Sequence, residues 1–181
     1  MKKLALALAA AGAFALAPAA PALASLETPE ARAEATDAAM MARQDMLEIF
    51  DGKRPANGKF LWRKGSFDGE PRVVISLSDQ LAFLYRGDEL VAVSSVSTGT
   101  DEKPTPTGIF EVLAKKTFHR SRKYDNAPMP FMQRIDKYGI ALHAGHLPGY
   151  PASHGCIRLP SAFAKRLYSV TDLGSTVMIG A

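Results

Sequence analysis

The residues best suited to chemistry lie close together in the C-terminal quarter of the chain. Residues 138–160 read YGIALHAGHLPGYPASHGCIRLP and hold three of the four histidines, His143, His146 and His154, and the only cysteine, Cys156. A thiol becomes an effective nucleophile when a nearby imidazole accepts its proton or stays beside it as imidazolium. We therefore predict a cysteine nucleophile with a histidine partner in this segment.

The residues around the cysteine have a pattern that suits an extended chain. Side chains of a strand alternate between two faces, so His154, Cys156 and Arg158 would share one face while Ile157 points into the core. Gly155 lets backbone N–H groups approach a substrate, and N–H groups beside a nucleophile can hold a developing oxyanion. In this setting we expect the thiol to be partly ionised.

Two other interpretations of these residues stay open. His143-x-x-His146 and His154-x-Cys156 offer four ligands of the kind that zinc prefers. The spacing is poor for zinc, because an H-x-x-H pair suits a helix face whereas residues 138–143 look like a strand, and a Pro/Gly-rich loop separates the two pairs. The second alternative is an inert buried cysteine, since a free cysteine behaves as a small hydrophobic residue.

The N-terminal segment predicts export. Lys2 and Lys3 precede a small and apolar run at residues 4–17, and residues 22–24 read A-L-A, which fits an A-x-A cleavage site. As a helix this run would be about 21 Å long, too short for a hydrocarbon core of about 30 Å. We expect residues 1–24 to be removed as a signal peptide, the mature chain to have no membrane span, and the protein to lie in the periplasm or cell envelope.

Length and composition favour one folded domain. The chain has 181 residues, 22 Lys+Arg against 18 Asp+Glu, and 47% hydrophobic residues, which is too apolar for a disordered chain. The basic run at residues 115–123 also carries aromatic residues, a mixture that can bind nucleic acid. Since an exported protein seldom meets nucleic acid, we expect no such partner. We interpret the run as a solvated loop, or as a rim for an acidic, carboxylate-bearing substrate.

The elements that must position the reactive residues are mainly strands. Before them, Thr28 is suited to cap a helix with Pro29 at its first position, which continues to residue 50 and ends at Asp51-Gly52. Ser161 is expected to cap a short helix over residues 162–168. Closely spaced short strands joined by turns favour a sandwich or barrel. The predicted strands cover residues 60–62, 72–78, 81–85, 90–96, 109–114, 138–143 and 176–179.

Three motifs carry a family resemblance. Residues 153–158 read S-H-G-C-I-R, residues 140–145 read I-A-L-H-A-G, and residues 105–110 read T-P-T-G-I-F. They resemble the S/T-H-G-C-hydrophobic-R/N signature, the I-H-G-T element and the T-P-x-G-x-F segment of the L,D-transpeptidases of the bacterial cell wall. Ala144 and Gly145 stand where the family usually has Gly-Thr.

The resemblance covers about residues 72–181, and together with the residue patterns above it gives the expected fold and division of the chain. The fold would be mainly β, a mixed-sheet sandwich or barrel, with an N-terminal helix and a short helix after the cysteine motif. Residues 1–24 would be the signal peptide, residues 25–71 the N-terminal helix and a turn-rich connection, and residues 72–181 the catalytic domain.

The resemblance also implies roles for the central site residues. Cys156 would be the nucleophile and His143 its general base. His154 would support the thiolate or the substrate, and backbone N–H groups near Gly155 and Cys156 would form the oxyanion hole. Arg158 would orient the cysteine loop or hold a substrate carboxylate.

Two further residues are candidate substrate contacts. His146 is either a loop residue or a contact to substrate, and Ser153 either contacts substrate or shapes the turn. The resemblance implies no metal and no organic cofactor.

The implied reaction is a two-step acyl transfer on peptidoglycan stem peptides. Cys156 would attack the carbonyl at the third position of a tetrapeptide stem, so that the terminal D-alanine leaves and a thioester remains. An amine of a second stem would then form a 3→3 cross-link. Water, a free D-amino acid or the lysine of an envelope lipoprotein are alternative acceptors. The competing functions are an L,D-carboxypeptidase of the same fold and a non-catalytic, zinc-stabilised envelope protein.

Overall fold

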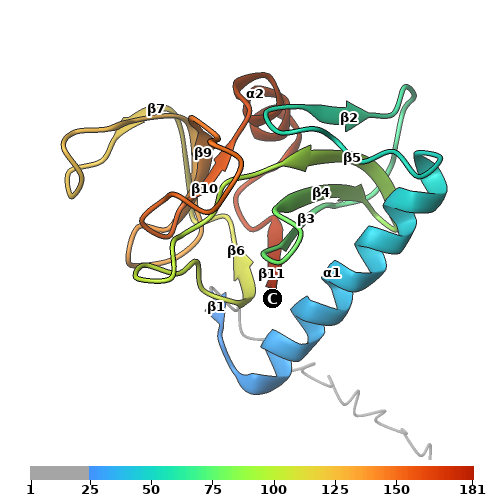
Figure 1. Cartoon of the computed structure of the whole chain (residues 1–181), viewed down its shortest axis with the longest axis horizontal. Coiled ribbons are helices and arrows are strands. Elements are labelled where there is room, and N and C mark those ends of the chain that lie inside the picture. The colour runs from blue at the N-terminus through green and yellow to red at the C-terminus, as the bar shows by residue number, and fades with distance from the viewer. Residues whose placement is uncertain (1–24) are drawn as a thin grey trace, which may run out of the picture.

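The computed structural model describes residues 25–181, which form two β-sheets and two helices (Figure 1). The predicted signal peptide at residues 1–24 lies outside the described residues. The elements are β1 (Ser25–Leu26), α1 (Pro29–Ile49), β2 (Phe60–Trp62), β3 (Pro71–Ser76), β4 (Leu81–Arg86), β5 (Glu89–Ser95), β6 (Gly108–Glu111), β7 (Ala114–Arg120), β8 (Pro128–Arg134), β9 (Ala141–Ala144), β10 (Ile157–Leu159), α2 (Ser161–Val170) and β11 (Thr176–Gly180).

Both sheets are mixed. The larger sheet has seven strands in the order β1-β6-β11-β3-β4-β5-β2, and the smaller has four in the order β10-β9-β8-β7. β11 runs parallel to β3 and β10 runs parallel to β9, whereas the other strand pairs are antiparallel. This arrangement confirms the predicted mainly β fold of mixed sheets with an N-terminal helix and a short helix after the cysteine motif.

The main apolar core joins the two sheets and α2. Val73 and Ile75 of β3, Leu142 of β9, Ile157 of β10 and Phe163 of α2 belong to one cluster, and each is at most 1% exposed. Every second residue of a strand faces the same side, so these strands bury one face here and leave the other for different contacts. The burial fixes β9 and β10, which carry the reactive residues, against the larger sheet.

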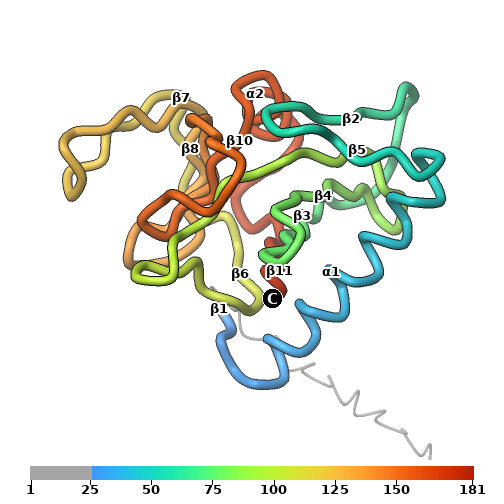
Figure 2. Tube along the Cα trace, in the orientation of Figure 1, coloured from blue at the N-terminus to red at the C-terminus, as the bar shows by residue number. Residues whose placement is uncertain are grey.

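Helix α1 covers the opposite face of the larger sheet, as the tube view in Figure 2 shows. The Thr28 hydroxyl accepts the Ala31 N–H at 3.2 Å and Pro29 occupies the first turn, which confirms the predicted start of the helix. Small residues and one methionine recur at helical spacing on its buried side. They are Ala31, Ala35, Ala39, Ala42 and Met46.

The basic run is not a loop as predicted. Its first residues form β7, which pairs antiparallel with β8, and neither strand was predicted from the sequence. β7 is the edge strand of the smaller sheet and most of its side chains are exposed or half-buried, so its sequence lacks a hydrophobic alternation. The main-chain hydrogen bonds to β8 hold it in place, and the hairpin projects from the rest of the molecule (Figure 1).

Two boundaries near the reactive residues also differ from prediction. Pro160 takes the position before α2, so Ser161 already lies in the first turn and its side chain makes no capping hydrogen bond. The strand predicted at residues 138–143 begins only at Ala141, because residues 136–140 form a turn around the Asp136 carboxylate.

Neither helix in residues 25–181 has the length and apolar character of a membrane-spanning segment.

Candidate active site

The register of the parallel strands β9 and β10 brings the reactive residues together. His143 lies opposite Arg158, and Leu142 lies opposite Ile157. Paired residues of neighbouring strands point to the same side of a sheet, so His143 and Arg158 share one face while Leu142 and Ile157 are buried on the other. The structure thus places Ile157 in the core, as the alternation predicts.

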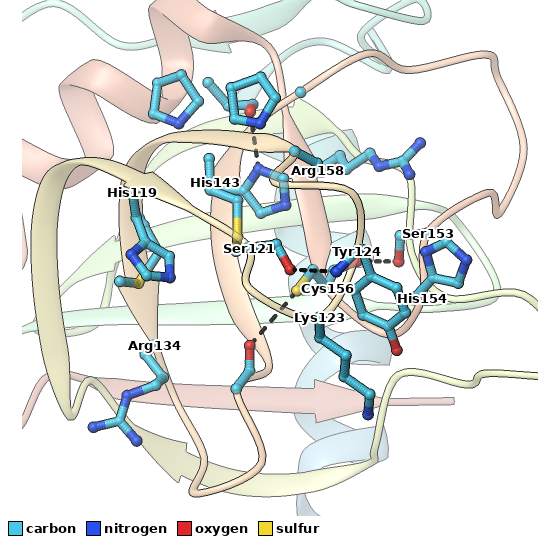
Figure 3. Close-up of a pocket in the computed structure, with 18 of the residues that line it drawn as sticks. His119, Ser121, Lys123, Tyr124, Arg134, His143, Ser153, His154, Cys156 and Arg158 are labelled. Carbon is cyan, nitrogen blue, oxygen red and sulfur yellow. Dashed lines mark hydrogen bonds between the residues drawn. The ribbon is translucent and has the colours of Figure 1, made fainter.

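Cys156 immediately precedes β10 and lies diagonally across from His143. Every second residue of a strand faces the same side, so the Cys156 and His143 side chains point to one face of the sheet. Cys156 and His143 line one cleft of about 1050 Å³ (Figure 3). Two methionines, Met129 and Met132 of β8, and Ala141 of β9 form a small apolar cluster against the cysteine. Cys156 and His143 therefore face the cleft, and apolar side chains pack against the cysteine.

The His143 imidazole is oriented by its own strand. Its Nδ1 lies 2.9 Å from the Ala144 carbonyl oxygen. A carbonyl can only accept a hydrogen bond, so Nδ1 carries the proton and the Nε2 lone pair is left to accept another. Burial lowers the pKa of His143; the Ala144 hydrogen bond raises it partly back, and the charge of Arg158 lowers it further. His143 is therefore neutral near pH 7 and able to act as a base.

The surroundings of the Cys156 thiol favour its protonated form. Burial raises its pKa, a hydrogen bond from the Ala141 backbone lowers it in part, and the Asp136 carboxylate raises it again. The Sγ atom lies 3.8 Å from the Gly139 carbonyl oxygen, the acceptor of its S–H. The expectation of a partly ionised thiol is therefore wrong, because desolvation outweighs the favourable neighbours. A base is needed to activate the sulfur.

Asp136 is a site residue that the sequence analysis missed. Its side-chain oxygen accepts the N–H groups of Tyr138, Gly139 and Ile140 at 2.9, 2.7 and 2.7 Å, and the residue is only 4% exposed. These bonds close the turn that presents the Gly139 carbonyl to Cys156. The signal in the sequence was the Asp-x-x-Gly spacing of residues 136–139, which is typical of a turn held by an aspartate side chain.

The loop before Cys156 is shaped by Ser153. The Ser153 hydroxyl donates to the Cys156 carbonyl oxygen at 2.5 Å and accepts the Gly155 N–H at 3.0 Å. Gly155 has φ +105°, and a Cβ there would lie 2.6 Å from Cδ1 of Ile140, so only glycine fits. Because the Gly155 N–H already has an acceptor, the Cys156 N–H is the better candidate for holding an oxyanion.

The two other predicted histidines, His154 and His146, lie at the rim of the cleft. His154 is exposed and stacks on Tyr124 from the β7–β8 turn, with ring centroids 4.2 Å apart and planes within 9° (Figure 3). Tyr124 also lies beneath the ammonium groups of Lys103 and Lys123. His146 is exposed at the edge of the cleft. The aromatic partner of His154 was not recognised as a site residue from the sequence.

The cleft is strongly basic. Among the described residues that line it there is no aspartate or glutamate, whereas six lysines and arginines do so. Such a cleft attracts anionic ligands. The six residues are Lys116, Arg122, Lys123, Arg134, Lys137 and Arg158.

The four candidate zinc ligands do not form a metal site. Within residues 25–181 no group of three or more His, Cys, Asp or Glu side chains is placed to hold a metal ion. His143 uses Nδ1 on a backbone carbonyl, and His154 is stacked on Tyr124 at the rim. The geometry therefore supports a thiol and imidazole pair over a zinc centre.

Comparison with known proteins agrees with this geometry. The sequence model of the YkuD family, the L,D-transpeptidase catalytic domain, matches residues 70–179. No curated protein sequence matches the chain significantly.

Solved L,D-transpeptidase structures share the fold. One from Mycobacterium smegmatis is 22% identical, with a TM-score of 0.58 over 62% of this chain and 59% of that chain. One from Stackebrandtia nassauensis is 26% identical, with a TM-score of 0.57 over 76% of this chain and 63% of that chain. A third, from Xylanimonas cellulosilytica, is 25% identical, with a TM-score of 0.58 over 75% and 68%. The chain thus spans less than two thirds of the length of the first two.

Proposed function

This chain belongs to the L,D-transpeptidase catalytic domain family, and from that premise we propose that it is a cysteine acyltransferase acting on peptidoglycan stem peptides. One observation carries the proposal: His143, with Nδ1 bonded to a carbonyl and Nε2 left to accept, faces the same cleft as the Cys156 thiol. Burial lowers the pKa of His143 and raises that of Cys156, which favours a neutral base and a protonated thiol. That is the resting state that general-base activation of a nucleophile requires.

The first half-reaction forms a thioester. Nε2 of His143 takes the thiol proton as Sγ of Cys156 bonds to the carbonyl carbon at the third position of a tetrapeptide stem. The carbonyl oxygen becomes an oxyanion, held by the Cys156 N–H. The tetrahedral intermediate collapses as the imidazolium of His143 returns the proton to the departing amine, and D-alanine leaves.

The second half-reaction releases the product. An acceptor amine attacks the thioester carbonyl and gives its proton to His143. The C–S bond then breaks, and the proton returns to Sγ, so that the enzyme is restored. We propose the side-chain amine of a second stem as the acceptor, which yields a 3→3 cross-link; the lysine of an envelope lipoprotein and a free D-amino acid are chemically equivalent acceptors.

The charge of the cleft supports this choice of substrate. A tetrapeptide stem ends in a carboxylate, and the cleft is lined by six basic side chains. Arg158 lies beside the reacting pair, since it is two residues from Cys156 and opposite His143 in register. We assign it to a substrate carboxylate, and assign the basic β7–β8 hairpin to the rim that receives the rest of the stem.

The direct test is incubation of the purified protein with a disaccharide-tetrapeptide, with products resolved by mass. Transpeptidation predicts free D-alanine and a dimer lighter than two substrates by one D-alanine. A tripeptide with no dimer would assign the L,D-carboxypeptidase activity instead. If wild-type protein gave the same products as Cys156→Ala, the acyltransferase proposal would be wrong.

We further propose that the protein acts in the periplasm or cell envelope. The support is the basic, apolar and A-x-A pattern of residues 1–24. Protein isolated from the envelope fraction is expected to begin at Ser25 in an intact-mass measurement. An envelope protein that retained residues 1–24 would contradict cleavage at this site.

A further inference from the structure

The T-P-T-G segment at residues 105–108 has no part in the mechanism above, yet the structure ties its first residue to the nucleophile loop. Thr105 is 4% exposed. Its hydroxyl donates to the Gly155 carbonyl oxygen at 2.9 Å and accepts the Gly99 N–H at 2.8 Å. One buried hydroxyl therefore bridges two backbone segments more than fifty residues apart in sequence.

The bridge fixes the orientation of a reactive peptide group. The Gly155 C=O and the Cys156 N–H belong to one planar trans peptide, so they point in opposite directions. Cys156 lines the cleft, whereas Thr105 is not among the described residues that line it. Thr105 therefore holds the carbonyl on the side away from the cleft, and this directs the Cys156 N–H toward the cleft.

The surrounding backbone leaves the hydroxyl as the main tether of this peptide. Gly155 has no side chain, and its own N–H is bound to Ser153 rather than to a neighbouring element. Gly99 allows the other partner to approach, because a Cβ there would lie 2.2 Å from the Lys103 carbonyl oxygen. Both groups that Thr105 bonds thus belong to glycines, of which Gly99 lies at a close backbone approach and Gly155 is closely covered by the Ile140 side chain.

The loop around this peptide is also held from the same side. The Thr98 carbonyl accepts the N–H groups of Ala152 and Ser153 at 3.0 and 2.9 Å, and the Thr100 N–H donates to the Ser153 carbonyl at 3.2 Å. These bonds fix the start of the loop, and the Thr105 bond fixes its last peptide before the sulfur. Without the Thr105 bond, only the neighbouring residues would restrain rotation of the Gly155–Cys156 peptide.

We propose that Thr105 is a positioning residue for acyl transfer, whose hydroxyl orients the Gly155–Cys156 peptide so that the Cys156 N–H meets the developing oxyanion. This role rests on the proposed acyltransferase function. Thr105 touches no substrate; it acts through the peptide bond that it holds.

The proposal is tested by two reactions of the same sulfur. Acylation by a carbapenem develops an oxyanion in its transition state, whereas alkylation by iodoacetamide displaces iodide at a saturated carbon and develops none. Thr105→Val keeps the shape of the side chain and removes the hydroxyl. Complete loss of one oxyanion donor costs on the order of 10²–10³ in rate. In Thr105→Val the Cys156 N–H is still present but no longer oriented, so we expect acylation to be slower by about 10- to 100-fold. The rate of alkylation should stay within about twofold of wild type, since the geometry of the sulfur itself is set by Ser153 and Gly139.

Two variants serve as controls. Thr105→Ser keeps a hydroxyl and should restore acylation to near the wild-type rate. Thr107→Val changes a half-buried threonine of the same motif and should leave both reactions unchanged. If Thr105→Val proves too unstable to assay, Thr105→Ala carries the same expectation.

The outcomes separate the inference from the function on which it rests. Slower acylation with unchanged alkylation in Thr105→Val, rescued by Thr105→Ser, supports the positioning role. Wild-type acylation in Thr105→Val overturns the role and leaves the acyltransferase function standing. Equal losses in both reactions would also overturn it, since they would show a general disturbance of the loop. A wild-type protein that is alkylated but never acylated would overturn the proposed function itself.

Discussion

The larger sheet with helix α1 and the loop that carries Cys156 are held together by different forces. Between α1 and the sheet lie apolar side chains such as Met46, Phe83 and Leu81, which are at most 2% exposed. The loop at residues 150–156 buries few large apolar groups. It is held mainly by hydrogen bonds from residues 97–105, which include Ser97 Oγ to the Tyr150 carbonyl at 2.8 Å.

We infer that the first region sets the stability of the fold and the second sets its reactivity. Apolar burial is non-directional and scales with area, so it stabilises the fold without orienting any one atom. Hydrogen bonds weaken steeply when misaligned, so they orient individual peptide groups. Substitutions in the two regions are therefore expected to separate the free energy of unfolding from the rate of acylation.

The largest effect is expected at the sulfur. Wild-type protein incubated with a carbapenem should gain one drug mass, located by peptide mapping to Cys156, and Cys156→Ala should gain none. The melting temperature of Cys156→Ala should be close to that of wild type, because the thiol is only half-buried and contributes little to the core. One equivalent of bound metal in the wild-type protein, no adduct, and loss of stability in Cys156→Ala would instead support the zinc alternative.

Removal of the base should give the next largest effect on reactivity. His143→Ala is expected to slow acylation by on the order of 10²–10⁴, the usual cost of losing a general base. His146→Ala changes an exposed histidine at the rim of the same cleft and should cost far less, so it is the matched control. Stopped-flow measurement of carbapenem acylation distinguishes the two. Equal losses at both positions would contradict the assignment of His143 as the base.

A substitution in the core under α1 is expected to lower stability and leave the acylation rate unchanged. Phe83 is fully buried there, and Phe83→Ala should lower the free energy of unfolding by about 3–5 kcal/mol. Phe118→Ala on the exposed face of β7 removes the same side chain and should change stability by less than about 0.5 kcal/mol. Urea unfolding measures both. The acylation rate of the folded Phe83→Ala protein should match wild type; a tenfold loss there would break the comparison.

The smallest effect is the dependence of acylation on pH near neutrality. Burial lowers the pKa of His143 below its usual value of about 6.5, so the neutral base persists above that pH and the rate should fall only in more acidic solution. Burial raises the pKa of Cys156 above its usual value of about 8.5, so alkylation, which needs the thiolate, should still rise through pH 8. Between pH 7 and 8 we expect less than about a twofold change in acylation and about a tenfold rise in alkylation. Parallel profiles would show that a preformed thiolate is the nucleophile.

Local pattern was enough to predict the features that depend on neighbours in the chain. The cap at Thr28, most of the strands of the larger sheet and the buried face of β10 at Ile157 follow from residue type and from periods of 3.6 and 2. Strand β7 was missed because an edge strand exposed on both faces has no such period. The family was recognisable because its motifs are short contiguous strings.

The family, the mainly β class and most of the residues that can do chemistry are readable from local sequence, because short contiguous motifs and simple periods carry them. The orientation and the protonation of those residues depend on the folded chain. The protonated thiol and neutral imidazole depend on burial, and the Thr105–Gly155 bond depends on two distant segments meeting. Desolvation and hydrogen-bond direction arise from packing in space, which no local pattern of residues contains.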